Sequence, residues 1–168
     1  MANTFELISS VVVGSGGASS IDFTSIPSTF TDLCLFLSGR DGTYTSTTST
    51  AYYTFNNTSA NRSSRYLYGN GSAAGSGTST SMLFPNMPGA NATSNTFGNG
   101  SIYIPNYAGS TYKSSSVDIV PENNASSTFM TFTANLWSDT SAINRITLTC
   151  DGAFAQYSTA YLYGVKNA

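Results

Sequence analysis

The sequence predicts an all-β protein, an antiparallel two-sheet β-sandwich of the jelly-roll kind with about ten short strands. Three observations predict this fold. In several short runs, apolar and polar residues alternate with a period of two, which is typical of strands that bury one face. Aromatic residues make up 13% of the chain, strong helix formers such as Glu, Lys and Gln are scarce, and no long segment has a helical period. Polar turn residues separate the runs at the spacing of a sandwich.

The alternation is clearest in residues 129–149. Within 129–137, the apolar side chains at positions 130, 132, 134 and 136 alternate with Thr and Asn at positions 131, 133 and 135. In 143–150, Ile146, Leu148 and Cys150 share one side. The polar segment 138–141 joins the two runs, so we expect an antiparallel hairpin. The apolar sides of these runs, together with one earlier run, form the expected core: Leu33, Leu35, Leu37, Phe132, Leu136, Ile146 and Leu148.

The remaining strand candidates are short apolar and aromatic runs bounded by Gly, Pro, Asn or Ser. In chain order they are 5–13, 20–23, 32–40, 51–55, 65–68, 82–84, 96–104, 112–120 and 156–165. The run 32–40 is apolar on both sides at its centre, which indicates a position inside a sheet.

The segments between these runs are expected to be turns and loops. Two prolines indicate a loop at 85–95, and residues 121–127 are predicted to form a turn. Residues 72–80 are rich in Gly, Ser, Ala and Thr and predict a flexible insert. Neither side of that insert has enough strands to close a sandwich, so we expect one domain over residues 1–168.

The charge balance excludes several classes of partner. Charged residues are only 8% of the chain, against about 25% in typical proteins, and the net charge is −2. The six Lys and Arg residues are scattered, whereas a phosphate backbone requires clustered cations, so we expect no nucleic-acid partner. The apolar runs are too short to span a membrane, and the first residues lack the features of a signal peptide. Cys34 and Cys150 are expected to be free thiols.

Enzymatic chemistry has little support in the sequence. The absence of histidine excludes Ser-His-Asp and Cys-His machinery and zinc sites built on imidazole. No phosphate-binding glycine motif is present, and we expect no cofactor and no metal. Two carboxylates suffice for glycoside hydrolysis, but most of the acidic residues lie in turns or at strand ends, where they commonly cap backbone amides. These acids are Glu6, Asp22, Asp32, Asp41, Asp118, Glu122, Asp139 and Asp151.

Eleven tyrosines supply another type of candidate site. A tyrosine has a flat apolar ring and a polar tip, and it can pack in a core, line a subunit interface or stack on a sugar. Those near predicted loops are the interface or glycan-contact candidates: Tyr52, Tyr66, Tyr68, Tyr103, Tyr107 and Tyr112.

Four segments in order resemble a group of small virion proteins of tailed phages, of the cyanophage type. They are SIDFTSIPSTFTDL at 20–33, RYLYGNG at 65–71, LWSDTSAINRITL at 136–148 and YLYGVK at 161–166. The resemblance spans nearly the whole chain, and its motifs are strand and turn signatures without a catalytic residue. It implies a β-sandwich on a phage particle, on the capsid or in a tail fibre.

The sequence begins with its first strand candidate and has no coiled coil or collagen-like repeat for a fibre shaft. We therefore expect a capsid cement or decoration protein, assembled in the host cytoplasm, that sits on the capsid surface as a homotrimer and bridges subunits of the major capsid protein. Two alternatives remain open. One is a tail-fibre or head-fibre module that binds host surface glycans through loop tyrosines, and the other is a glycan-cleaving enzyme that uses two carboxylates.

Overall fold

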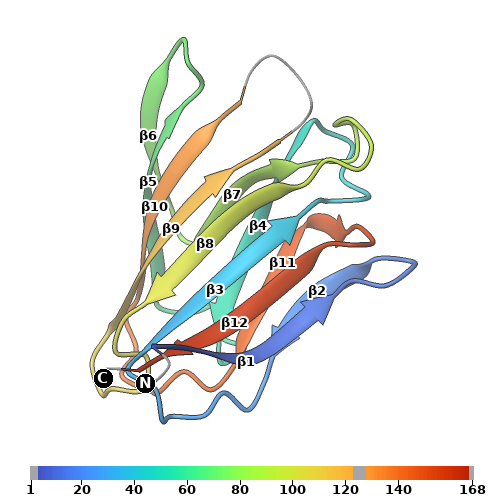
Figure 1. Ribbon diagram of the computed structural model, residues 1–168. Helices are drawn as coiled ribbons and strands as arrows, with labels where there is room; N and C mark the ends of the chain where they lie inside the picture. Colours follow the sequence, from blue (N-terminus) through green and yellow to red (C-terminus); the bar gives the residue numbers. More distant parts are fainter. Residues whose placement is uncertain (1–3, 123–127, 167–168) are drawn as a thin grey trace.

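The computed structural model describes residues 4–122 and 128–166, and this part of the chain forms twelve strands in two packed sheets (Figure 1). All strand pairs are antiparallel, which confirms the predicted β-sandwich. The strands are β1 Phe5–Val12, β2 Ala18–Phe23, β3 Asp32–Gly39, β4 Thr48–Phe55, β5 Arg62–Gly69, β6 Ala74–Ser79, β7 Met82–Pro88, β8 Gly98–Ile104, β9 Lys113–Val120, β10 Met130–Trp137, β11 Ile146–Phe154 and β12 Thr159–Val165.

The two sheets have different sizes. The large sheet has the order β1-β12-β3-β8-β9-β10-β5-β6, and the small sheet has the order β2-β11-β4-β7. The strands from β1 to β4 alternate between the two sheets, and β7-β8 and β11-β12 cross between them again. This gives the interlocked order of a jelly roll. The pairs β5-β6 and β9-β10 are insertions that extend the large sheet beyond β8.

The insertions make the large sheet wider than the small one. The edge strand of the small sheet, β7, packs against β8, β9 and β10 and touches β5. The β5–β6 hairpin extends beyond it, and Figure 1 shows this hairpin at the upper left, past the edge of the small sheet. One face of the hairpin therefore has no sheet packed over it.

The core lies where the two sheets overlap. Leu33, Leu35 and Leu37 of β3 and Ile146 and Leu148 of β11 are buried, as predicted. β3 also lies inside its sheet, between β12 and β8, as its two apolar faces predicted. Burial of one such side chain contributes about 1.5–3 kcal/mol to stability.

The prediction for β10 had the right alternation and the wrong face. Phe132 and Leu136 are not in the core: they are 51% and 38% exposed and point away from the small sheet. Thr131, Thr133 and Asn135 are buried instead. A period of two shows which residues share a face, but the neighbouring layer decides which face is buried. Here that layer is β7, which presents polar groups to β10.

Contacts with β7 explain two of these three buried polar residues, Asn135 and Thr131. The side-chain amide of Asn135 accepts a hydrogen bond from the Leu83 N–H at 3.0 Å and donates to the Leu83 carbonyl at 3.5 Å. The Asn86 amide donates to the Thr131 hydroxyl at 2.7 Å. Asn135 thus pairs with the free edge of β7 as a neighbouring strand would, which satisfies backbone groups that would otherwise be buried without partners.

The predicted hairpin over 129–149 is also wrong. β10 pairs with β9 and β5 in the large sheet, whereas β11 pairs with β2 and β4 in the small one. Residues 138–145 cross between the sheets, whose spacing in a sandwich is about 10 Å. Ile143 in this segment is buried in the core, and its N–H donates to the Tyr107 carbonyl at 3.0 Å. A buried residue in the connection is typical of a segment that crosses between two sheets, whereas a tight turn lies at the surface.

Two loop predictions are corrected as well. Residues 72–80 contain β6, which is an edge strand and needs hydrogen bonds to only one neighbour, β5. β7 continues through Pro85 to Pro88 because it is an edge strand, where a missing N–H is tolerated. The register between β4 and β7 shifts between Ser49 and Ala51, where one residue of β4 lies opposite two residues of β7. This shift is a β-bulge on β7, and Asn86 within it has a positive φ of 66°. Of the predicted turn at 121–127, residues 123–127 lie outside the described residues.

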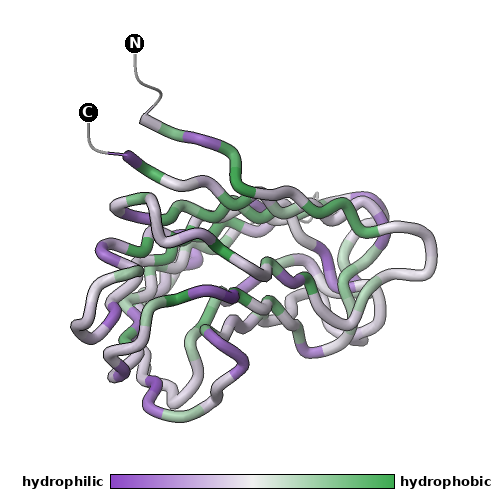
Figure 2. Tube along the Cα trace, turned by 90° about the horizontal axis from the view of Figure 1, so that it is seen from below, coloured by the Kyte–Doolittle hydropathy of each residue, from purple (hydrophilic) through white to green (hydrophobic). Residues whose placement is uncertain are grey.

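The two ends of the described chain lie together, at one corner of the two-layered sandwich (Figure 2). The Lys166 N–H donates to the Thr4 carbonyl at 2.9 Å, and the Lys166 ammonium pairs with Glu6 at 2.6 Å. No helix in the described part of the chain is long and apolar enough to cross a membrane.

Candidate functional site

The buried carboxylate of Asp41 has structural partners. The Asp41 side chain is completely buried and accepts hydrogen bonds from the N–H groups of Thr43, Tyr44 and Gly152 and from the Ser49 hydroxyl, at 2.7–2.9 Å. Burial opposes its charge, but these donors outweigh burial and hold the Asp41 pKa below its ordinary value. Within residues 4–122 and 128–166, no group of three or more Cys, Asp or Glu side chains is placed to hold a metal.

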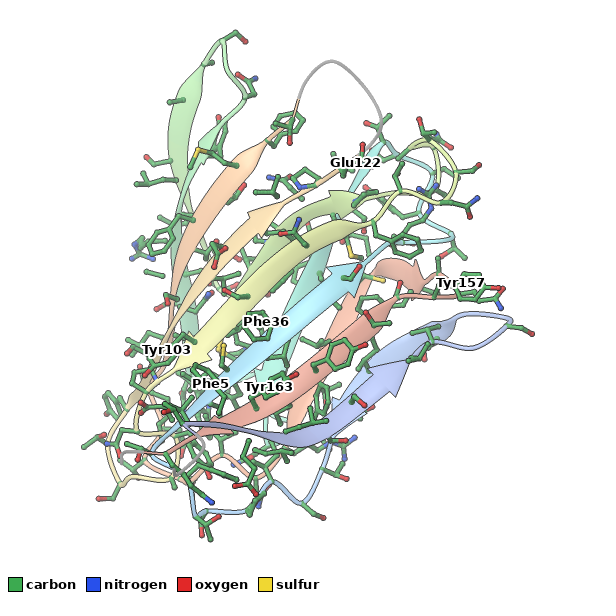
Figure 3. The ribbon with its side chains drawn as sticks, in the orientation of Figure 1. Phe5, Phe36, Tyr103, Glu122, Tyr157 and Tyr163 are labelled. Carbon is green, nitrogen blue, oxygen red and sulfur yellow. The ribbon has the colours of Figure 1, made fainter. Side chains whose placement is uncertain are left out.

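The first unusual surface is the outer face of the large sheet, which is the face turned away from the small sheet. The strand registers place Tyr163, Cys34 and Tyr103 side by side across β12, β3 and β8, and they place Tyr161 beside Phe36. The Phe36 and Tyr163 rings meet edge to face with centroids 5.9 Å apart. Figure 3 shows Phe36, Tyr103 and Tyr163 together on this face. We call Phe36, Tyr103, Tyr161 and Tyr163 the aromatic half.

The other half of the outer face is more exposed and is mainly aliphatic, with Phe132 as its aromatic member. Phe132 of β10 lies beside Leu67 of β5, and Met130 and Leu136 lie on the same side of β10. Met130 is 67% exposed and Leu67 is 62% exposed. With Val120 of β9, these residues form what we call the aliphatic half. Monomeric proteins rarely expose large apolar patches, and those that occur commonly mark an interaction surface.

A polar strip separates the two halves. Ser101 of β8 and Ser116 and Asp118 of β9 lie along it, and the Ser101 hydroxyl donates to the Asp118 carboxylate at 2.5 Å. At the margin of the aromatic half, the Tyr103 hydroxyl donates to Asp32 at 2.5 Å, and this hydrogen bond raises the Tyr103 pKa to about 12. Tyr103 is therefore a neutral phenol with a fixed orientation.

The second unusual surface is a groove of about 580 Å³ at the edge of the small sheet. We call it the tyrosine groove. One wall is the uncovered inner face of β10, β5 and β6, and the floor is the outer side of β4 and β7. Its lining residues are Thr50, Tyr52, Tyr66, Tyr68, Thr78, Ser79, Ser81, Leu83, Pro85, Asn86, Phe129 and Thr131. None of these residues is charged.

Glycines on β6 position the two tyrosines of the wall. Tyr66 lies directly opposite Gly77, and Tyr68 lies directly opposite Gly75. A Cβ on Gly77 would collide with the Tyr66 ring, and a Cβ on Gly75 would collide with the Tyr68 ring. Each ring therefore lies across β6 in the space that a side chain would fill. The two ring centroids are 6.5 Å apart.

The floor carries the third tyrosine. The Tyr52 hydroxyl donates to Asp151 at 2.8 Å, and the same carboxylate accepts the Thr50 N–H at 2.9 Å. Burial, and then the hydrogen bond to Asp151, raise the Tyr52 pKa to about 12. The floor thus presents a neutral, fixed ring beside Leu83, which lies next to Tyr52 in the register of β4 and β7.

The structure divides the six candidate tyrosines among four places. Tyr52, Tyr66 and Tyr68 meet in the tyrosine groove, and Tyr103 lies on the outer face. Tyr107 is completely buried and belongs to the core, where its hydroxyl donates to the Pro27 carbonyl, so it cannot contact a partner at the surface. Tyr112 is 62% exposed in the loop before β9 and lines neither surface.

Sequence reasoning missed the aliphatic half, because two of its residues, Phe132 and Leu136, were assigned to the core. It also missed Gly75 and Gly77, because segment 72–80 was assigned as an insert. The alternation of glycine in 74–79, after alternating tyrosine in 66–68, is the signal that could have found them. Comparison of the chain with protein-family models, with curated proteins and with solved structures gives no match.

Proposed function

We propose that this protein is a structural component of a phage particle, a capsid decoration or cement protein, and that the outer face of its large sheet binds neighbouring subunits. The virion assignment is supported by the resemblance to small tailed-phage proteins in segments such as 20–33 and 136–148. The binding role is supported by one observation above all: the exposed Phe36, Leu67, Met130 and Phe132 lie on a single sheet face.

The composition of this face fits a protein interface. Aromatic residues and Met are enriched at the centre of protein interfaces, and charged residues are depleted there. On this face the aromatic half supplies rings, the aliphatic half supplies Met130 and Leu67, and Asp118 in the strip between them already accepts a hydrogen bond from Ser101. Covering this face would therefore bury much apolar surface and few charges, which favours association.

The proposed mechanism is mechanical. Rigid sandwiches associate as trimers and bridge subunits of the major capsid protein, so that the shell resists the pressure of the packaged genome. The rigidity comes from a single core packed between the two sheets. In this core the Trp137 and Phe55 rings pack edge to face, with 5.6 Å between their centroids. No reactive centre is required for this role.

The test uses shells that lack this protein and purified protein added back. Wild-type protein is expected to bind the shells in many copies, whereas Phe36→Ser and Phe132→Ser are expected to lose binding while remaining folded. Tyr112→Ser is the control, because it removes an exposed aromatic residue in the loop before β9, outside the residues named on the outer face. The proposal is wrong if intact particles carry only a few copies at the tail, or if both outer-face variants bind the shells like the wild type.

A further inference from the structure

We infer that the tyrosine groove is a binding site for a neutral oligosaccharide, whose sugar rings stack on Tyr66 and Tyr68. The site lies on the inner side of the β5–β6 hairpin, opposite to the aliphatic half, so it does not depend on the subunit contacts proposed above. Its volume of about 580 Å³ falls within the usual range of small-ligand sites, about 300–1,000 Å³.

The first argument is the aromatic platform. Because Tyr66 and Tyr68 lie across Gly77 and Gly75, one side of each ring rests on β6 while both residues line the groove. Their centroids are 6.5 Å apart and their planes differ by 36°, so they offer two successive surfaces along one strand. A sugar ring has an apolar C–H face and a polar rim, and a tyrosine matches both features with its ring and its hydroxyl.

The second argument is the polar chemistry of the lining. Hydroxyl and amide groups surround the rings, and none of the lining residues carries a charge. The Tyr66 and Tyr68 hydroxyls have no hydrogen-bond partner among the described residues, so they are available to a ligand. A groove with neutral donors and acceptors and no Lys or Arg cannot compensate the charge of a phosphate, sulfate or carboxylate. The chemistry therefore selects an uncharged, hydroxyl-rich ligand.

The third argument concerns an extended peptide. A peptide entering a groove beside a sheet edge usually gains affinity by pairing with the edge strand. Two edge strands border this groove, β6 and β7. At β7, the Asn135 amide already binds the N–H and the carbonyl of Leu83. Pro85 and Pro88 have no N–H to offer. Backbone pairing with β7 is thus blocked, and a peptide that pairs with the other edge strand, β6, is an alternative that the experiment below tests.

The experiment is an NMR titration of the isotope-labelled full chain with four neutral hexasaccharides, based on maltose, cellulose, chitin and mannan, and with oligogalacturonate as a charged comparison. At least one neutral oligosaccharide is expected to shift resonances of Thr78 and Asn86, and oligogalacturonate is expected to shift none. Tyr68→Ala is expected to lower the affinity by about tenfold, because it removes one of the two rings on which the sugar stacks.

The glycines provide a sharper variant. Gly77→Ala keeps every aromatic residue but displaces the Tyr66 ring, so it is expected to weaken sugar binding. Gly69→Ala on β5 is the matched control, because its Cβ would meet only Met130 Cγ at 3.9 Å, an ordinary contact. Phe132→Ser is expected to leave sugar binding unchanged, which separates this site from the outer face.

The inference is overturned if none of the four neutral oligosaccharides shifts groove resonances at millimolar concentration. It is also overturned if oligogalacturonate binds more tightly than they do, or if Tyr68→Ala, at a position already 40% exposed, leaves the affinity unchanged. A peptide that shifts the same resonances when the sugars do not would assign the groove to a protein partner.

Discussion

Replacing Phe132 by alanine tests the orientation of β10. A phenylalanine in the core costs about 3–5 kcal/mol when it is cut back to alanine. In the structure Phe132 is 51% exposed and leaves no cavity when truncated. Since full burial of such a side chain contributes about 1.5–3 kcal/mol, half of that contact contributes about 1 kcal/mol. We therefore expect Phe132→Ala to lower the free energy of unfolding by about 1 kcal/mol.

Phe55→Ala is the matched comparison. Phe55 is the same residue type but completely buried, and it contacts Trp137 in the core, so its loss is expected to cost about 3–5 kcal/mol. Urea unfolding followed by the fluorescence of Trp137 measures both variants, at dilutions where the midpoint no longer depends on protein concentration. A loss above about 3 kcal/mol for Phe132→Ala would show that this residue lies in the core and that the outer face has been misassigned.

Three further predictions concern the interior. Asn135→Ala is expected to lower the free energy of unfolding by about 1–3 kcal/mol in the same assay, because the N–H of Leu83 loses its buried acceptor. Acid is expected to destabilise the fold below about pH 4: the pKa of Asp41 is lower in the folded state, so its stabilisation is full above the unfolded pKa and is lost as the pH falls through the folded one. Asp41→Asn is expected to be less stable at pH 7 and to lose less stability between pH 7 and pH 3. Burial raises the pKa of the Cys34 thiol, and burial together with the nearby Asp41 carboxylate raises the pKa of the Cys150 thiol to about 12. Because the thiolate is the reactive form, iodoacetamide at pH 8 is expected to label both cysteines in urea and neither in the native protein.

The periodicity of the chain was enough to predict the fold class and most strand positions. Strands such as β3 and β11 could be predicted because their apolar residues face the other sheet and polar segments mark their ends. The core positions Leu35 and Leu148 follow directly from that pattern. Two of the four edge strands, β1 and β2, were predicted. The other two were harder to predict, because β6 and the second half of β7 have little apolar content and include glycine or proline. Their place in the sheets depends on a neighbouring strand more than on local propensity.

The candidate sites were less predictable because they depend on the layer that covers each strand face. Tyr52 and Tyr66 are distant in sequence, and only the overhang of the large sheet past β7 brings them into one groove. Tyr107 and Tyr112 both lie near loops, yet one is completely buried and the other is 62% exposed. Tyrosine suits either environment, so residue type alone cannot separate the two cases.

The inverted face of β10 links the two surfaces. Because Thr131 and Asn135 point inward, Asn135 binds the N–H and the carbonyl of Leu83 at the edge of β7, and Thr131 accepts a hydrogen bond from the Asn86 amide. The same inversion turns Phe132 and Met130 outward, where they have no partner within the described chain. A strand with apolar residues inward would have buried the edge of β7 against side chains that cannot form hydrogen bonds, at a cost of about 1–3 kcal/mol for each unpaired group. The polar interior that pairs with β7 and the apolar exterior that favours subunit contact therefore have a single structural cause.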